Sequence, residues 1–275
     1  MDRLIAELYD HVDATEARYA SLARPGVRVH PVPYFGGIAS ARVVTVGVNP
    51  SAEEFVGGRW PHARPTPSAL RERLDCYFER APHPWFRVWD DALGHLSVSY
   101  REGAAHLDLS PRATLGFQAF RGEPARRDLF LDMVRGDLPW FGRLLAEQCP
   151  AVRLVLFAGG VGNIYLDEFV ARWPTGPARL EFPEGRPRGG EAPVRWPSIR
   201  VGARRVSAFF CGVSPSSGAR AGLLVERVEE HREQLRSALG SHRRGRSRIA
   251  TPKNIVRSKG TPVGLFSGGR LRPRP

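Results

Sequence analysis

The sequence predicts an α/β protein whose central, mostly parallel sheet is covered on both faces by helices. Two observations carry this prediction. Short runs rich in β-branched residues alternate along the chain with longer stretches of helical periodicity, as in folds built from βα units. The runs are nearly continuous in apolar residues, which is typical of buried parallel strands. With 42% hydrophobic residues, the chain can bury one sizeable core within its first 240 residues.

The first half of the chain is expected to supply two strands and three helices. Apolar positions recur at helical spacing over residues 3–23, and an Arg-Pro-Gly breaker ends that helix, so we place the N-terminal helix within residues 1–25. A β-branched run at 42–48 stops at Asn49-Pro50, as a buried strand that feeds a loop does. A long loop rich in Pro and Gly then covers 49–67. The other elements expected here are helices at 68–80 and 84–95 and a strand at 104–111.

The second half continues the alternation of helix and strand. A long helix is expected over about 124–148, and the run RLVLFAGG at 153–160 is the clearest buried strand. It opens through glycines into a helix near 163–172. A hairpin strand at 194–201, a strand at 204–213 and a helix to about 239 complete a single domain over 1–240. Ligands bind such sheets at the carboxyl ends of the strands, which here carry Asn49, Asp108, Gly159, Gly160 and Ser214.

Positive charge is concentrated at the carboxyl end of the chain. Lys and Arg number 41 against 28 Asp and Glu, a formal charge of +13. Ten of the basic residues, Arg243 and Arg244 among them, lie within 241–275, a segment without acidic residues. The preceding domain is therefore close to neutral. The low hydrophobicity of 241–275 and its many Gly, Pro and Ser residues predict a tail that is disordered when free and binds a polyanion.

Composition argues against several function classes. No run approaches 18 apolar residues and the N-terminus is acidic and amphipathic, so we expect no transmembrane helix and no signal peptide. Three scattered cysteines predict neither disulfides nor a metal site. Lysine occurs only at Lys253 and Lys259, so the domain lacks the lysine of a Walker-type NTPase or of a Schiff-base enzyme. We expect a monomer in the bacterial cytoplasm, associated with the nucleoid. We also expect that it uses no cofactor and, in particular, no nucleotide cofactor.

Two strand-end loops carry a more specific signal. GVNPS at 47–51, followed by a long Gly-rich loop, resembles the first motif of the uracil-DNA glycosylase superfamily, whose mismatch-specific branch has a Gly-x-Asn-Pro-Gly signature after the first strand. SPSSGAR at 214–220 resembles the second motif of the thymine/uracil mismatch glycosylases. The resemblance covers roughly residues 30–240. It implies a three-layer α/β/α fold and a monofunctional DNA glycosylase, which flips a nucleotide out of the duplex, hydrolyses its N-glycosidic bond and leaves an abasic site.

The resemblance also implies roles for individual residues. Asn49 would position the attacking water through its side-chain oxygen, although Asn-Pro is also a common start of a turn. Ser214 stands where the family often has a His or Asn that contacts the base. In the family, one loop pinches the DNA backbone and fills the gap that the flipped base leaves in the stack. The residues that match this loop are Ser214, Ser216, Ser217 and Arg220. Further phosphate contacts are expected from Ser51, Arg243 and Arg244.

Aromatic rings near the first motif are expected to stack on the flipped base. Phe55 and Trp60 in the loop after Asn49 are the candidates, although either ring could simply anchor that loop. Further pocket walls and polar groups are expected near the rim from Tyr34, Phe35, His62 and His106. Gly159, Gly160 and Asn163 either let the strand at 153–160 approach the substrate or serve tight strand-to-helix packing.

One position departs from the family pattern. In the single-strand-selective branch, a base-reading Asn lies three residues before a Pro at the end of the second strand, and the matching residue here is Asp108. Asn both accepts from and donates to uracil, whereas an ionised Asp only accepts and so prefers an exocyclic amine such as N4 of cytosine. We therefore expect Asp108, with Asn49, to act on a modified cytosine, hydroxymethylated or glucosylated as in phage DNA, in anti-phage defence. The plain alternative is that Asp108 caps a helix.

Other functions stay open at this point. The same fold could excise uracil or mismatched thymine in base excision repair, or bind DNA without catalysis. A nucleotide- or nucleoside-processing enzyme of doubly wound type is a further class, but such an enzyme has no use for the basic tail.

Truncation at residue 240 tests the role of the tail. If its cations neutralise phosphates, each lost contact should flatten the slope of log affinity against log salt by about 0.9. Binding of duplex DNA is measured by fluorescence anisotropy between roughly 50 and 200 mM salt. A truncated protein with the salt slope of the full chain would contradict the tail's assignment.

Overall fold

The computed structural model describes residues 1–56, 60, 63–80, 82–115, 117–120, 122–159, 178–181, 198–213, 215 and 221–240. One compact unit spans Met1–Ser241. The helix predicted near 163–172, the tail over 241–275, and the residues Gly160, Asn163 and His62 lie outside the described residues.

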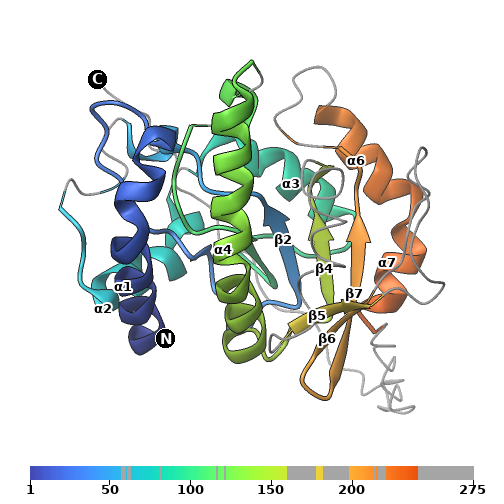
Figure 1. Ribbon diagram of the computed structural model, residues 1–275. Coiled ribbons are helices and arrows are strands. Elements are labelled where there is room, and N and C mark those ends of the chain that lie inside the picture. The colour runs from blue at the N-terminus through green and yellow to red at the C-terminus, as the bar shows by residue number, and fades with distance from the viewer. Residues whose placement is uncertain are drawn as a thin grey trace, which may run out of the picture. The chain divides into compact units, whose positions relative to one another are not determined.

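A mixed sheet forms the centre of this unit (Figure 1). Among the described residues it has seven strands, in the order β1-β3-β2-β4-β7-β6-β5. The four central strands β3, β2, β4 and β7 pair in parallel, and the remaining strands add antiparallel at the two edges. The expected α/β class with a parallel sheet centre is thus confirmed. The strands are β1 (Tyr34–Phe35), β2 (Val43–Gly47), β3 (Ala104–Asp108), β4 (Leu154–Phe157), β5 (Ala178–Glu181), β6 (Ser198–Val201) and β7 (Arg204–Phe210).

Two of these strands were not expected from the sequence. β1 has two residues, too few to show a periodicity, and it is defined by its antiparallel pairing with β3. β5 lies in a segment rich in Pro and Gly that reads as a loop, and it is held by pairing with β6. Pairing with a neighbouring strand, rather than local propensity, decides both, since edge strands take their hydrogen bonds from distant parts of the chain.

Local capping explains where two of the helices begin. The Thr66 hydroxyl accepts from the backbone N–H of Ala69 at the start of α2, and the ring of His83 accepts from the N–H of Trp85 at the start of α3. Each helix has Pro in its first turn, where no intrahelical N–H is needed. The helices are α1 (Asp2–Tyr19), α2 (Pro67–Asp75), α3 (Pro84–Gly94), α4 (Pro124–Gln148), α6 (Ala221–Glu230) and α7 (Arg232–Ala238), with 3₁₀ turns η1 (Ala20–Leu22), η2 (Ala52–Phe55), η3 (Tyr77–Glu79) and η4 (Phe117–Phe120).

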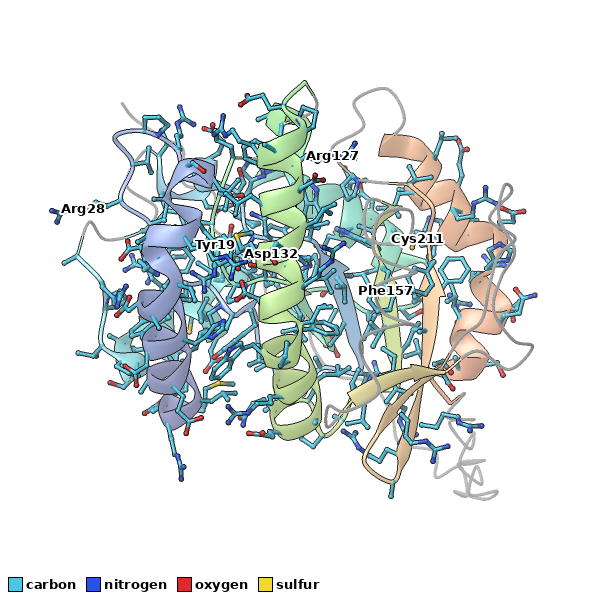
Figure 2. The ribbon with its side chains drawn as sticks, in the orientation of Figure 1. Tyr19, Arg28, Arg127, Asp132, Phe157 and Cys211 are labelled. Carbon is cyan, nitrogen blue, oxygen red and sulfur yellow. The ribbon has the colours of Figure 1, made fainter. Side chains whose placement is uncertain are left out.

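The helices contact one another in two groups. α1 contacts α2 and α4, and α3 contacts α6. Figure 1 shows α1 and α4 side by side. In Figure 2 Tyr19 of α1 lies toward Asp132 of α4, and the Tyr19 hydroxyl donates to that carboxylate at 3.0 Å. None of the helices in the described part of the chain is both long and apolar enough to cross a membrane.

His30 lies buried among aromatic rings before β1. Its ring meets Phe55 and Trp60 edge-on, at centroid distances of 4.9 and 5.2 Å. Its Nδ1 lies 3.2 Å from the carbonyl oxygen of Pro31, to which the neutral ring donates. Burial lowers the pKa of His30 to about 4, because the imidazolium would lose its hydration.

This buried histidine should make the protein less stable in mild acid. The unfolded chain takes up a proton at His30 as the pH falls through 6.5, whereas the folded chain resists protonation down to about 4. Unfolding should therefore become easier across this window, by up to about 3 kcal/mol. His30→Phe keeps the ring contacts and should remove this part of the pH dependence, measured by urea denaturation at a series of pH values. If the free energy of unfolding depends on pH in the same way for both proteins below pH 6.5, the lowered pKa assigned to His30 is contradicted.

Candidate functional site

The ends of β2 and β3 bring the two central candidate residues to one edge of the sheet. The strand register pairs Gly47 with Asp108. The pairing continues into the loops, where the N–H of Leu109 donates to Gly47 at 3.2 Å and the N–H of Ser110 donates to Val48 at 3.0 Å. The loop that carries Asn49 and the loop after Asp108 therefore run together.

The side chain of Asn49 links these two loops. Its Nδ2 lies 2.9 Å from the carbonyl oxygen of Pro50, 3.1 Å from that of Arg112 and 2.9 Å from the hydroxyl of Thr114. All three acceptors lie on the nitrogen side of the amide, so the orientation of the group is defined. Oδ1 is turned the other way and accepts no hydrogen bond from the described residues, and the side chain is half-buried. Asn49 thus has a fixed acceptor that an outside donor can use.

A buried carboxylate holds the loop after β3, to which the side chain of Asn49 is hydrogen-bonded. Asp137 of α4 is 1% exposed. It accepts from the Ser110 hydroxyl at 2.6 Å and from Nε of Arg112 at 3.0 Å, and its other oxygen lies 2.7 Å from Nε2 of His11. The Arg112 guanidinium also donates to the Val12 carbonyl of α1 at 3.2 Å. The loop that orients Asn49 is therefore tied to both α1 and α4.

Asp108 ends β3 beside a histidine. Its Oδ1 lies 3.3 Å from Nε2 of His106, and the two side chains are 4% and 3% exposed. The backbone of Gly47 passes close to the same carboxylate. A Cβ atom at residue 47 would lie 2.4 Å from Oδ1 of Asp108 and 3.2 Å from Nε2 of His106. A larger residue at this motif position would therefore force the side chain of Asp108 to shift.

Aromatic rings surround His106 below the carboxylate. Phe35, Trp85 and Phe86 place their ring centroids 5.8, 5.0 and 5.2 Å from the imidazole. Trp85 is the half-exposed member of this group. Trp85 lies in the first turn of α3, and the packing of that helix against β3 places its ring next to His106.

The expected stacking residues pack against each other. Trp60 is stacked on Phe55 with centroids 5.7 Å apart and on Tyr77 at 6.2 Å, and it also meets Phe35 edge-on at 6.4 Å. Phe55 and Trp60 are only 7% and 3% exposed. Tyr34 is fully buried, and its hydroxyl donates to Asp75 of α2 at 2.9 Å. Of the four aromatic residues expected to line the base pocket, Phe35 is the one whose ring contacts His106.

Of the other residues expected to contact DNA or approach the substrate, Ser51 and Gly159 lie within the described residues. The Ser51 hydroxyl caps η2 by accepting from the N–H of Glu53 at 3.2 Å. A Cβ at Gly159 would lie 2.5 Å from the backbone of Val213, so this glycine permits close approach of the segments after β4 and β7. The remaining candidates, Ser214, Ser216, Ser217, Arg220, Arg243 and Arg244, lie outside the described residues.

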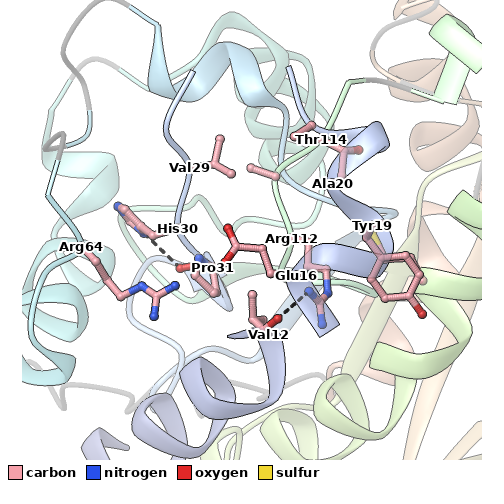
Figure 3. A pocket seen from close by; sticks show the side chains of 13 residues that line it. Val12, Glu16, Tyr19, Ala20, Val29, His30, Pro31, Arg64, Arg112 and Thr114 are labelled. Atoms are coloured by element: carbon pink, nitrogen blue, oxygen red, sulfur yellow. Dashed lines mark hydrogen bonds between the residues drawn. The ribbon is translucent and has the colours of Figure 1, made fainter. Parts of the chain in front are cut away.

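A cavity of about 160 Å³ is lined by the same 112–114 loop (Figure 3). It contains neither Asn49 nor Asp108. Its two arginines are already paired, Arg64 with Asp13 at 2.6 Å and Arg112 with Asp137 at 3.0 Å. Within the described ranges, no three His, Cys, Asp or Glu side chains gather in a way that could hold a metal ion.

Comparison of the chain with protein-family models gives no match, and comparison with curated proteins gives none either.

Removing the buried carboxylate should destabilise the protein strongly. Asp137→Ala leaves Arg112 buried without its partner, and the free energy of unfolding should fall by about 3–5 kcal/mol. Asp132→Ala is a matched control on the same helix, because it loses an ion pair with Arg18 that is exposed to solvent and a part-buried hydrogen bond from Tyr19. That variant should lose about 1–2 kcal/mol, less than Asp137→Ala. Equal losses in chemical denaturation would show that Asp137 does not hold the loop.

Proposed function

We propose that this chain is a monofunctional DNA glycosylase of three-layer α/β/α architecture, which excises a modified cytosine from DNA and leaves an abasic site. The observation that carries the proposal is the orientation of Asn49. Its NH₂ group is held by two loops, and Oδ1 is left as a fixed acceptor beside the strand end that carries Asp108. This is the arrangement that positioning a water molecule requires.

Hydrolysis of the N-glycosidic bond needs a placed water and a stabilised leaving group. Oδ1 of Asn49 accepts a hydrogen bond from the water, whose oxygen forms the new bond to C1′ of the sugar. The bond between C1′ and the base breaks, and its electron pair leaves with the base. The proton released by the water and the proton taken up by the base are exchanged with solvent. An amide is a poor base, so Asn49 contributes position, and the developing charges must be stabilised by the surroundings.

Asp108 supplies the selectivity in this proposal. Its carboxylate is paired with the imidazole of His106 and, when ionised, can only accept hydrogen bonds. A base with an exocyclic amine satisfies that acceptor, whereas the O4 atom of uracil or thymine places a second acceptor against it. Unmodified cytosine is the normal base of host DNA, so the favoured target is a substituted cytosine such as the hydroxymethylated or glucosylated bases of phage DNA.

DNA as the partner is supported by the placement of charge. Ten of the cations lie within 241–275, and they would contact phosphates without regard to sequence. The nearly neutral domain would then read the base. No cofactor takes part in the proposed reaction.

The proposal is tested by incubating the purified chain with oligonucleotides that carry uracil, mismatched thymine, cytosine, hydroxymethylcytosine or glucosylated hydroxymethylcytosine. Alkaline cleavage at abasic sites reports excision. We expect cleavage at the substituted cytosines, and Asn49→Ala should reduce its rate at least about 100-fold because the water loses its acceptor. Binding of the same DNA should change little.

The Asp132→Ala protein serves as the matched control and should cleave at the wild-type rate. Cleavage of uracil alone would assign the chain to base excision repair and would overturn the role given to Asp108. Tight DNA binding without cleavage of any base would make the chain a binding protein.

A further inference from the structure

A line of buried polar side chains leads from the core of the domain to Asp108. The Tyr100 hydroxyl lies 2.6 Å from Oγ1 of Thr45, which lies 2.8 Å from Nδ1 of His106, and Nε2 of His106 lies 3.3 Å from Oδ1 of Asp108. All four residues are at most 5% exposed. Buried polar groups in such numbers are costly unless each finds a partner, so the direction of every bond in the line matters.

One direction of donation satisfies every group in the line, although the Ala105 carbonyl, 3.5 Å from Oγ1 of Thr45, is a second and more distant acceptor. Burial raises the pKa of the Tyr100 phenol well above its ordinary value, so its hydroxyl keeps its proton and needs an acceptor. In this direction Tyr100 donates to Thr45, and the Thr45 hydroxyl donates to Nδ1 of His106 at 2.8 Å rather than to the Ala105 carbonyl at 3.5 Å. Nδ1 then acts as an acceptor, so the ring proton sits on Nε2, which donates to Asp108. The line ends on a carboxylate that receives one hydrogen bond at Oδ1.

The surroundings of His106 leave it little freedom. Its ring is enclosed by Phe35, Trp85 and Phe86, and its polar partners are Thr45 and Asp108. At the other end of the line, the carboxylate of Asp90 accepts from the backbone N–H of Tyr100 at 3.0 Å. Gly47 completes the enclosure, because any side chain there would meet both His106 and Asp108.

We infer that His106 is a positioning residue that presents Asp108 as an acceptor only, with Oδ1 engaged and Oδ2 left to read the base. The inference rests on the proposed function and deepens it. Selection of a 4-amino over a 4-oxo pyrimidine would follow from the whole line of Tyr100, Thr45 and His106, and not from Asp108 alone. Oδ2 of Asp108 accepts no hydrogen bond from the described residues, which leaves it for an amine donor.

Two substitutions at His106 separate positioning from simple packing. His106→Gln keeps a donor at about the place of Nε2, whereas His106→Leu fills the space without one. Single-turnover excision is measured on DNA that differs only in a 4-amino or a 4-oxo pyrimidine. We expect His106→Leu to lose about tenfold or more of the wild-type preference, as for loss of a hydrogen bond to a charged group, and His106→Gln to stay within about threefold of it.

Tyr100→Phe provides a milder test, because it removes only the hydroxyl at the far end of the line. It should lower the preference by about threefold. Unchanged preference in both His106→Leu and Tyr100→Phe would overturn the inference while leaving the glycosylase proposal intact.

A measurement without turnover keeps the two proposals distinct. Nitrogen-15 NMR of the imidazole in the wild-type chain should show the proton of His106 on Nε2, and Tyr100→Phe should weaken that preference. A proton on Nδ1 would overturn the inference whatever the enzyme excises. Absence of excision on every DNA would overturn the proposed function, and the NMR result would still decide the direction of the line.

Discussion

The ion pair between Asp137 and Arg112 is the interaction on which the geometry of the site depends. A carboxylate that is 1% exposed must be paired, since the loss of its hydration costs several kcal/mol. Asp137 meets this requirement with three partners from α1 and the loop after β3. These contacts tie the loop to α1 and α4. The loop places the Arg112 carbonyl and the Thr114 hydroxyl against the amide of Asn49, so a buried charge on one helix defines the direction of an acceptor at a strand end.

Close packing defines the position of the Asp108 carboxylate. The missing side chain at Gly47 leaves room for a carboxylate and an imidazole on the same face of β2 and β3. The glycine of GVNPS, the last residue of β2, thus has a steric role that the sequence motif does not reveal. Aromatic rings around His106 keep water from its sides, which makes the hydrogen bonds to Thr45 and Asp108 its main polar contacts. The two strand ends therefore carry groups of different kinds, a fixed amide oxygen and a fixed carboxylate.

The proposed division of labour between domain and tail follows from where charge lies. Cations concentrated in 241–275 suit contacts that are independent of sequence, whereas the domain has paired many of its arginines internally. Arg112 and Arg64 serve the fold in this way. Because these arginines are paired with carboxylates of the domain, the domain would recognise a base through neutral and acidic groups. Asn49 and Asp108 are such groups.

The sequence by itself determined the α/β class, the strands of its parallel centre and the placement of Asn49 and Asp108 at strand ends on one edge of the sheet. These depend on local periodicity and on turn chemistry, which a short window of residues contains. The pairing of β2 with β3 that makes the two residues neighbours came from the tertiary structure. Only the tertiary structure decided that β1 and β5 are strands, that Phe55 and Trp60 pack on each other, and that Asp137, Tyr100 and Trp85 bear on the site. A mid-helix Asp or a Tyr in a turn has no local signature of its role, because that role comes from partners far away in the chain that only folding brings within hydrogen-bond distance.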